Sequence, residues 1–312
     1  MLAGLDAFNG SFLADLDNTE NRISQVNKQL TSGFRVNEAS DDPAAIASIL
    51  SYQNQIEQTT QVATNLNLAG TVASSADGAL ASASTLLDQL ISIASQGASS
   101  TATAATRATL GQQVENIAQQ LVGIANTSVQ GQYIFGGDDP GTQPYTFSWS
   151  TPGSASLPGG VVQNNTAGST ATIANAAGST IVPGQTAQQI FDARNPDGTL
   201  AAGNIFQNVY ALGQALANND QTATQTAALS LQASVNTLGL ATTNNGNTEA
   251  WIQQAKTDAS ATLTNLQAEL GSLRDTDVAQ AATQLTTDQT ALEAALAAHA
   301  SLDVKSLFSY LG

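Results

Sequence analysis

The chain of 312 residues has no cysteine, few aromatic residues and few charged ones. Without cysteine it can form neither a disulfide framework nor a thiolate metal site. Aromatic residues make up 5% and charged residues 10% of the sequence, and no run approaches the roughly 20 apolar residues of a membrane span. The small side chains that make up most of the sequence favour closely packed contacts between helices, and they disfavour a core made of aromatic side chains.

The few charges that are present are mostly acidic. Eight basic residues face 24 acidic ones, which gives a net charge of −16. This balance argues against nucleic acid and against an anionic membrane surface as partners. The first turns carry Asp6, Asp15 and Asp17 and no basic cluster, so we expect no cleavable signal peptide.

Each end of the chain carries an apolar stripe at coiled-coil spacing. The stripe at the start steps by three or four through Leu2, Leu5, Phe8, Phe12, Leu16, Thr19, Ile23, Val26 and Leu30. The stripe at the end steps through Leu263, Leu266, Leu270, Leu273, Asp277, Ala281, Leu285, Asp288, Leu292, Leu296 and His299. Two such stripes indicate either a helix pair closed by the chain ends or a surface for neighbouring copies.

A single terminal helix cannot bury its stripe alone. Ordering about 30 residues costs more conformational entropy than one partly buried stripe returns. We therefore expect residues 1 to about 35, and the last 35 or so, to be disordered in the monomer and to become helical on assembly.

Between the stripes the spacing predicts further helices. A long helix over about 44–95 is followed by a Gly/Ser/Thr break at 97–103 and a returning helix to about 128. Glycines then flank 131–138, which indicates a strand or hairpin arm. From 138 to about 185 the chain is rich in Gly, Ser, Thr and Asn and holds five of the seven prolines, so it predicts a small β or loop insertion with strands near 145–149 and 160–162.

Helical spacing resumes at 205–216 and, after a turn at 218–220, continues from Leu231 to His299 in one register. A polar stretch at 242–247 allows a kink. Because the register survives across it, we expect one continuous helix through to the C-terminal stripe.

No residue pattern predicts catalysis, a cofactor or a metal site. Asp41 and Asp42 are adjacent, so their side chains diverge on a helix, and Ser40 or Asp41 is expected to cap a helix with Pro43 in its first turn. The one histidine, His299, lies on the apolar stripe and is expected to pack there, because a metal needs several donors. No P-loop, G-x-S-x-G or H-E-x-x-H motif occurs.

The residues beside the two stripes are more specific. The run Leu30-Thr31-Ser32-Gly33-Phe34-Arg35-Val36-Asn37, followed by Ser40-Asp41-Asp42-Pro43-Ala44, closely resembles the N-terminal motif of bacterial flagellin-like proteins. Leu273-Arg274-Asp275-Thr276-Asp277-Val278-Ala279 and the end Ser306-Leu307-Phe308-Ser309-Tyr310-Leu311 resemble the C-terminal motif of the same family. The resemblance covers roughly two thirds of the chain.

Within this family the hook-filament junction proteins, the FlgL type, are the better match, and flagellin, the filament subunit, is the alternative. Pro43 is typical of the junction branch. So are the hairpin motif at 131–137 with Pro144-Tyr145 behind it, and the Leu-Phe-Ser-Tyr-Leu tail. The start Met-Leu-Ala-Gly-Leu-Asp departs from the usual opening of the family. A coiled-coil secreted adhesin or translocator would share the stripes but would lack both motifs.

The resemblance implies a mainly α, elongated rod of long helices from both chain ends with a small β-rich insertion. It implies three layers: a terminal coiled coil of 1–40 and 276–312, a helical rod of 41–137 and 190–275, and an outer insertion of 138–189. The positions expected to act in assembly are Leu5, Phe8, Phe12, Leu16, Ile23, Leu30, Arg35, Asn37, Asp41, Asp42, Leu285, Leu292, Leu296, Leu307 and Leu311.

The function implied is structural, with no enzymatic activity and no cofactor. The chain would be exported to the extracellular flagellum with an export chaperone, form a homo-oligomeric ring or helix, and contact the hook-side junction protein and flagellin. Arg35 would lie in the connector between inner and middle layers, where we expect a salt bridge to a nearby carboxylate.

Overall fold

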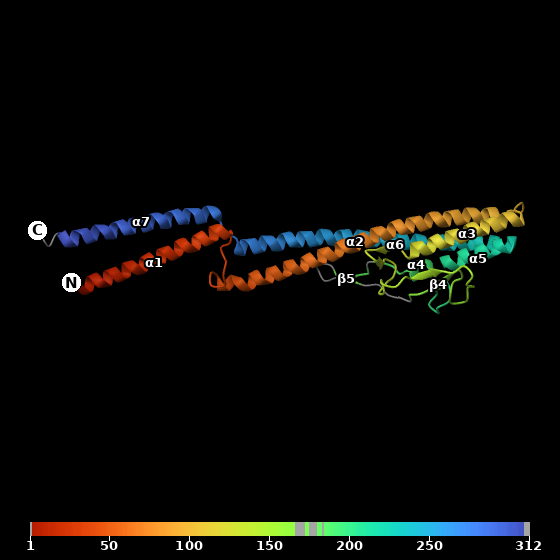
Figure 1. Ribbon diagram of the computed structural model, residues 1–312, viewed down its shortest axis with the longest axis horizontal. Helices are drawn as coiled ribbons and strands as arrows, with labels where there is room; N and C mark the ends of the chain where they lie inside the picture. Colours follow the sequence, from red (N-terminus) through yellow and green to blue (C-terminus); the bar gives the residue numbers. More distant parts are fainter. Residues whose placement is uncertain (1, 166–171, 175–179, 183, 309–312) are drawn as a thin grey trace. The chain divides into compact units, whose positions relative to one another are not determined.

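The computed structural model describes residues 2–165, 172–174, 180–182 and 184–308, and the fold is mainly α-helical (Figure 1). The described helices are α1 (Leu2–Ser32), α2 (Pro43–Gly97), α3 (Ala104–Ala125), α4 (Ala187–Phe191), α5 (Ile205–Ala217), α6 (Gln221–Arg274) and α7 (Val278–Phe308). These bounds confirm the predicted helices near the start, over 44–95, up to about 128 and over 205–216. Among the described residues no helix combines the length and the hydropathy that crossing a membrane requires.

The strands among the described residues form three separate antiparallel pairs. β1 (Ser128–Val129) pairs with β2 (Gln132–Tyr133), β3 (Tyr145–Phe147) with β4 (Val161–Gln163), and β5 (Ile173–Ala174) with β6 (Thr180–Ile181). The first is the predicted hairpin arm, and its turn uses left-handed backbone at Gln130 and Gly131. The second confirms the expected strands of the insertion.

The chain divides into two compact units. One holds residues 1–59 and 262–312, and the other holds residues 60–261. Both boundaries fall inside continuous helices, α2 and α6, and the insertion shares the core of the second unit. The three-layer division stays a prediction about the assembled molecule.

In the first unit α1 and α7 lie side by side and antiparallel, so that both chain termini lie at the same end of the pair (Figure 1). Both segments are helical within a single chain, unlike the expected disorder, because each terminal helix supplies the other's partner. Gly33 follows α1 with φ +76 and donates its N–H to Gln29 O at 2.8 Å, which is the glycine stop that the sequence predicts.

The expected continuous C-terminal helix is wrong. α6 ends at Arg274 and α7 begins at Val278, with residues 275–277 between them. Phe34 forms an antiparallel bridge with Asp275, and the Thr276 N–H donates to Gly33 O at 3.0 Å. Backbone groups on either side of Asp275 therefore pair with the segment that follows α1, and these groups are not available for the hydrogen bonds of a continuous helix. The polar stretch at 242–247, by contrast, lies inside an unbroken α6.

The core of the second unit is a seam of small and branched side chains from α2, α3, α5 and α6, closed by a few rings from the insertion. Leu80, Leu87 and Leu90 of α2 are essentially fully buried, as are Leu121 and Leu212. Further along, Leu66 packs with Ala255 and Ala259, and Ala69 and Ala73 pack with Ile252. Small residues at these positions let long helices approach closely.

Buried Arg107 ties the chain reversal between α2 and α3 to the end of α5. Its Nε donates to Gly97 O at 2.8 Å, and its two terminal nitrogens donate to Ser99 O and Asn219 Oδ1. The charge lies against the carbonyl end of α2, where the helix dipole is negative. These contacts stabilise a guanidinium that burial would otherwise penalise.

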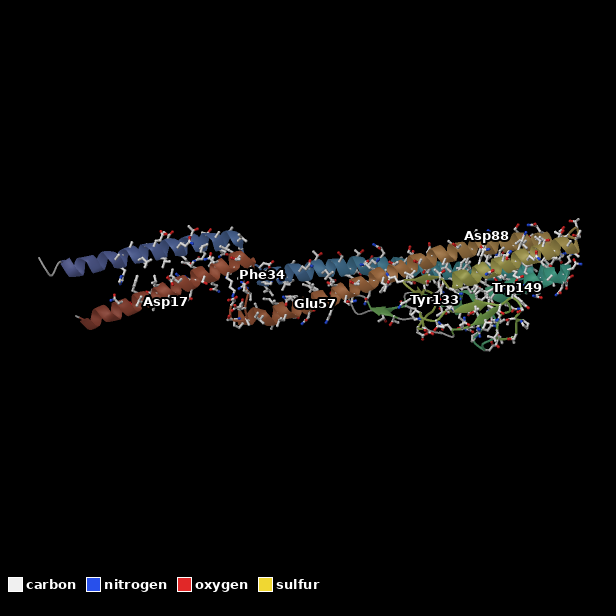
Figure 2. All side chains as sticks on the ribbon, in the orientation of Figure 1. Asp17, Phe34, Glu57, Asp88, Tyr133 and Trp149 are labelled. Carbon is white, nitrogen blue, oxygen red and sulfur yellow. The ribbon has the colours of Figure 1, made fainter. Side chains whose placement is uncertain are left out.

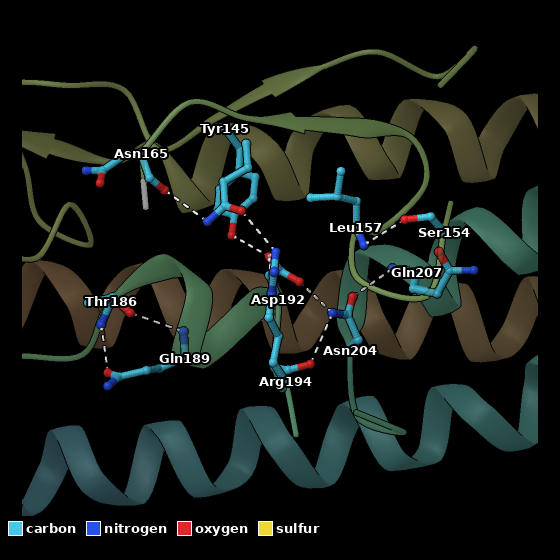
Figure 3. A network of polar contacts seen from close by, with 12 residues as sticks. Tyr145, Ser154, Leu157, Asn165, Thr186, Gln189, Asp192, Arg194, Asn204 and Gln207 are labelled. Carbon is cyan, nitrogen blue, oxygen red and sulfur yellow. Dashed lines mark hydrogen bonds and ion pairs between the residues drawn. The ribbon is translucent and has the colours of Figure 1, made fainter. Parts of the chain in front are cut away.

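A buried polar network joins the insertion to the helices (Figure 3). The Tyr145 hydroxyl donates to Asp192 Oδ2 at 2.9 Å, and the Asn204 amide donates to Asp192 Oδ1 at 2.7 Å. Arg194 binds the same carboxyl group and also donates to Gln163 Oε1 of β4. Burial, and then the neighbouring Asp192, raise the pKa of the Tyr145 hydroxyl, so it stays a hydrogen-bond donor.

Replacing Tyr145 with phenylalanine tests this network. Tyr145→Phe keeps the ring but leaves the buried Asp192 carboxyl group without one donor. We expect the free energy of unfolding to fall by about 1 to 3 kcal/mol. The measurement is denaturant unfolding. Tyr210→Phe, at a half-buried ring that packs on Trp149, is the matched control, and equal stability of the two variants would contradict the network's role.

Candidate assembly site

The predicted stripe of α1 faces α7 but is only half-buried. Phe12, Leu16, Ile23 and Leu30 are half-buried, as are Thr19, Val26 and Gln29 between them, and the other described side chains of α1 are exposed. On α7, Leu285 and Leu292 are likewise half-buried, and Ala281 is buried. Leu5, Phe8 and Leu307 lie on the two helices with side chains outside the described set, and Leu311 lies outside the described residues.

Leu296 departs from the expected stripe. Its side chain is 47% exposed, whereas Ala295 is half-buried and continues the steps from Leu292 to His299. The half-buried positions step by three from Leu292 to Ala295 and then by four to His299, whereas the expected stripe stepped by four and then by three. The smaller alanine therefore faces α1 in place of the leucine. Leu296 is thus available to a partner outside this pair, as is Leu13, which is 58% exposed.

Polar side chains complete the seam where the apolar stripe is interrupted. Arg22 Nε lies 3.5 Å from Asp288 Oδ1, whose side chain is only 5% exposed and also accepts from Gln284. Near the chain ends the rings of Phe12 and His299 stack with centroids 4.2 Å apart. The packed position expected for His299 is confirmed, with Asn9 Oδ1 at 3.2 Å from its Nε2.

Where the terminal pair meets the following helices, residues 33–42 and 275–277 form a structure that we call the connector (Figure 2, near Phe34). The Arg35 and Val36 N–H groups both donate to Arg274 O, at 2.7 and 3.3 Å. The Arg274 guanidinium lies 4.0 Å from the centre of the Phe34 ring, a cation–π contact. Val36 is buried in a small core with Ala45, Ile49 and Leu270.

Arg35 makes the expected salt bridge. Its Nη1 lies 3.0 Å from Asp42 Oδ2, and its Nη2 donates to Leu273 O at 2.7 Å. One side chain thus joins the connector, the start of α2 and the end of α6. The planar guanidinium suits this double contact, which the single ammonium of a lysine would not reproduce.

Asp41 and Asn37 hold the turn of the connector. Asp41 Oδ2 accepts from the Asn37 and Glu38 N–H groups at 2.8 and 2.9 Å, and these bonds, the Glu38 bond first, lower the pKa of Asp41. The Asn37 amide donates back to Phe34 O at 2.8 Å. The expectation that Ser40 or Asp41 caps α2 is wrong, because the Asp41 carboxylate is used within the turn.

The cap of α2 is Asp42. Its Oδ1 accepts from the Ala45 N–H at 3.1 Å, and Pro43 occupies the first helical position, as predicted. The Arg35 hydrogen bond, followed by the Ala45 N–H, lowers the pKa of Asp42. Asp41 and Asp42 thus have separate structural tasks.

The connector contains residues that the sequence analysis did not assign to it. Asp277, read there as part of the stripe, accepts from the Ala279 and Gln280 N–H groups at the start of α7. An aspartate three residues before a glutamine, ahead of an apolar run, is a capping pattern that would have indicated the new helix. Phe34 and Asp275 carry no comparable signal, because their bridge joins segments about 240 residues apart.

Comparison with known proteins shows which family the first part of this chain resembles. Residues 9–139 match the bacterial flagellin N-terminal helical region, which covers α1, the first part of the connector, α2, α3 and the β1–β2 hairpin. This part of the chain is therefore similar to the helical region of flagellins.

Among curated proteins, this flagellin-like chain is 28% identical over 116 residues to a flagellin of Clostridium tyrobutyricum. The match covers 37% of the chain and 31% of that flagellin, so the chain matches about a third of its relative's length. Among solved structures, a protein described as a flagellar hook-associated protein of Vibrio parahaemolyticus has a TM-score of 0.63 at 19% identity, over 75% of this chain and 100% of that one. FlgL of Bacillus cereus has a TM-score of 0.52 at 18% identity, over 72% and 99%. The flagellin-like fold is therefore shared with both.

Replacing Arg35 tests the connector. In Arg35→Ala the Asp42 carboxylate loses its main hydrogen-bond donor, so its pKa should rise toward the ordinary 3.8, measured by NMR titration of the side chain. Because the folded-state pKa is depressed, the stabilisation from this pair is present above the ordinary value and is lost as the pH falls through the folded pKa.

Assembly of the flagellin-like chain should weaken in Arg35→Ala and be only partly restored in Arg35→Lys, which keeps the charge without the fork. The measurement is the assembled fraction at neutral pH. If Arg35→Ala leaves the Asp42 pKa, the stability and assembly unchanged, the connector does not depend on this side chain.

Proposed function

We propose that this chain is a structural subunit of the bacterial flagellum that self-assembles through its terminal helices. The observation that carries the proposal is the coincidence of two findings. The segment that matches the flagellin N-terminal helical region is also the segment that supplies the half-buried stripe of α1 and the start of the connector.

The burial pattern supports assembly as the function. A helix pair that leaves its apolar stripe half-exposed gains free energy when further copies cover it. Leu13 and Leu296, exposed on the same two helices, add apolar surface for such neighbours. The interface positions of the sequence analysis, from Leu5 to Leu311, are proposed to act here, and Arg35, Asn37, Asp41 and Asp42 to set the connector.

Within the flagellum we propose the hook-filament junction as the place of this subunit. The Asp-Asp-Pro sequence at 41–43 and the hairpin at 128–133 support it, as does the similarity of fold to a hook-associated protein and to a FlgL over nearly their whole lengths. The insertion, with two short hairpins on the helical core, is proposed to face outward.

Flagellin itself is the second candidate. The flagellin of Clostridium tyrobutyricum and a B-type flagellin of Pseudomonas aeruginosa match this chain in sequence, the latter at 29% identity over 117 residues and 24% of its own length. The family match lies in the N-terminal helical region, which a junction subunit and a filament subunit would both need, so the flagellin similarity supports the flagellum more strongly than it supports the filament.

On this proposal the partners are further copies of the chain, the hook-side junction protein and flagellin, together with an export chaperone before assembly. The place of action is the extracellular flagellum, and the role is structural rather than enzymatic. A secreted adhesin or translocator is the remote alternative, which the two terminal motifs and the flagellin helical region disfavour.

Counting copies in native flagella separates the candidates. We expect an antibody against residues 138–189 to label only the hook end of purified flagella, and quantitative mass spectrometry to find the chain scarce beside the major subunit. Labelling along the whole filament, with the chain as the dominant protein, would identify it as flagellin. Absence from flagella that are otherwise complete would contradict both.

A further inference from the structure

The two most exposed large apolar side chains among the described residues lie on one helix. Leu229 is 76% exposed and Leu240 is 67% exposed, both on α6 in the second unit. Eleven residues make about three helical turns, so the two leucines share one face and stand about 16 Å apart. We call this face of α6 the leucine ridge.

The leucine ridge lies in a segment without charge. No Asp, Glu, Lys or Arg occurs between residues 221 and 248, although the chain carries 24 acidic residues. Surface helices of soluble proteins normally carry charge on the solvent side. Two exposed leucines on an uncharged stretch of a helix are typical of a surface that another protein covers.

An uncharged groove lies elsewhere on the same unit. It has a volume of about 180 Å³ and lies between α2 and the β1–β2 hairpin. Its described lining residues are all uncharged, and its apolar walls come from Leu68, Val72, Val129, Tyr133, Ile134 and Pro140. Leu68 is 47% exposed, so the groove is open to a partner.

We propose that the leucine ridge of one copy of this chain docks in this groove of the next copy. The proposal rests on the proposed function and names the contact that joins the helical cores of neighbouring subunits. The lack of charge on both surfaces is the reason for choosing a second copy of the chain as the partner. Copies with a net charge of −16 repel one another, and this repulsion opposes a contact least where both surfaces lack charge.

The positions of the two surfaces favour a chain of copies over a closed pair. The leucine ridge belongs to α6, whereas the groove belongs to α2 and the hairpin, so the contact joins unlike surfaces. When two copies make this heterologous contact once, one ridge and one groove stay free, so the contact continues from copy to copy into a ring or a helix. The same contact made twice between two copies about a two-fold axis would stop at a dimer. Asp138 and Asp139, next to Pro140 in the sequence, would repel a partner with exposed carboxylates.

Charge placed on either surface should block the contact. In the full chain, Leu229→Glu with Leu240→Glu changes the ridge and Leu68→Glu changes the groove. We expect each to raise the concentration needed for assembly at least tenfold, because a glutamate would be buried without a partner. Leu157→Glu, at another leucine that is 51% exposed, is the control and should assemble like the wild type. Circular dichroism and thermal unfolding establish that the variants fold.

Disulfide trapping tests the pairing itself. The chain has no cysteine, so introduced thiols report only the designed contact. Asn236→Cys lies between the two ridge leucines, and Gln132→Cys lies in the groove. When flagella are isolated and oxidised, a thiol pair loses two electrons to the added oxidant and two protons to water as the S–S bond forms. We expect the double variant to give a ladder of linked copies and each single variant to stay monomeric.

The outcomes separate the two proposals. If the wild type enters flagella but ridge and groove variants assemble normally and the double cysteine variant gives no ladder, the ridge–groove contact is wrong and the proposed function stands. Dimers from Asn236→Cys alone would replace the heterologous contact with a self-complementary one. If the wild type is absent from flagella and does not self-assemble, both proposals fail.

Discussion

The structure depends on the incomplete burial of the terminal helices. Each of α1 and α7 has one apolar stripe, each packs mainly on the other among the described residues, and their large stripe residues remain half-exposed. Burial is the main favourable term in folding, and it must offset the entropy of ordering about 30 residues in each helix. A helix pair with half of that gain is marginal alone, and a third or fourth neighbouring helix would complete its core. On the proposed function, assembly is the step that gives the chain ends their full stability.

The connector determines how this marginal pair is tied to the rest of its unit. The bridge from Phe34 to Asp275, the two bonds of Arg35 and the cap at Asp42 are mostly polar and partly exposed. Exposed ion pairs contribute little free energy individually. These contacts therefore fix the path of the chain through the connector more than they stabilise the fold. The second unit differs, because its leucine and alanine seams are dry and its polar groups, around Asp192 and Arg107, are satisfied by several partners. The apolar stripe of the first unit stays half-exposed, whereas the second unit buries most of its core within the chain.

Local patterns were enough to predict most helices, a strand or hairpin arm at 131–138 that overlaps the observed hairpin at 128–133, and the packed His299, because these follow from spacing, glycines and caps within a few residues. The bridge between Phe34 and Asp275 and the network at Asp192 could not be predicted in this way, since they join residues that only the folded chain brings together. The break at 275–277 was missed for a related reason. The apolar register continues from Leu273 through Ala281, and only the Asp277 cap reveals that a new helix begins. At Leu296 the spacing allowed two registers, and the packing against α1 selected Ala295.

Hydrogen exchange in the free chain tests the central claim most directly. The exchange of backbone amides in α1 and α7 is compared with that in α3 and α5, first in dilute monomer and then in the assembled state. Because incomplete burial lowers the free energy of local opening, we expect α1 and α7 to exchange rapidly in the monomer, α3 and α5 to be strongly protected, and the difference to disappear on assembly. Strong protection of both terminal helices in dilute monomer would contradict the account.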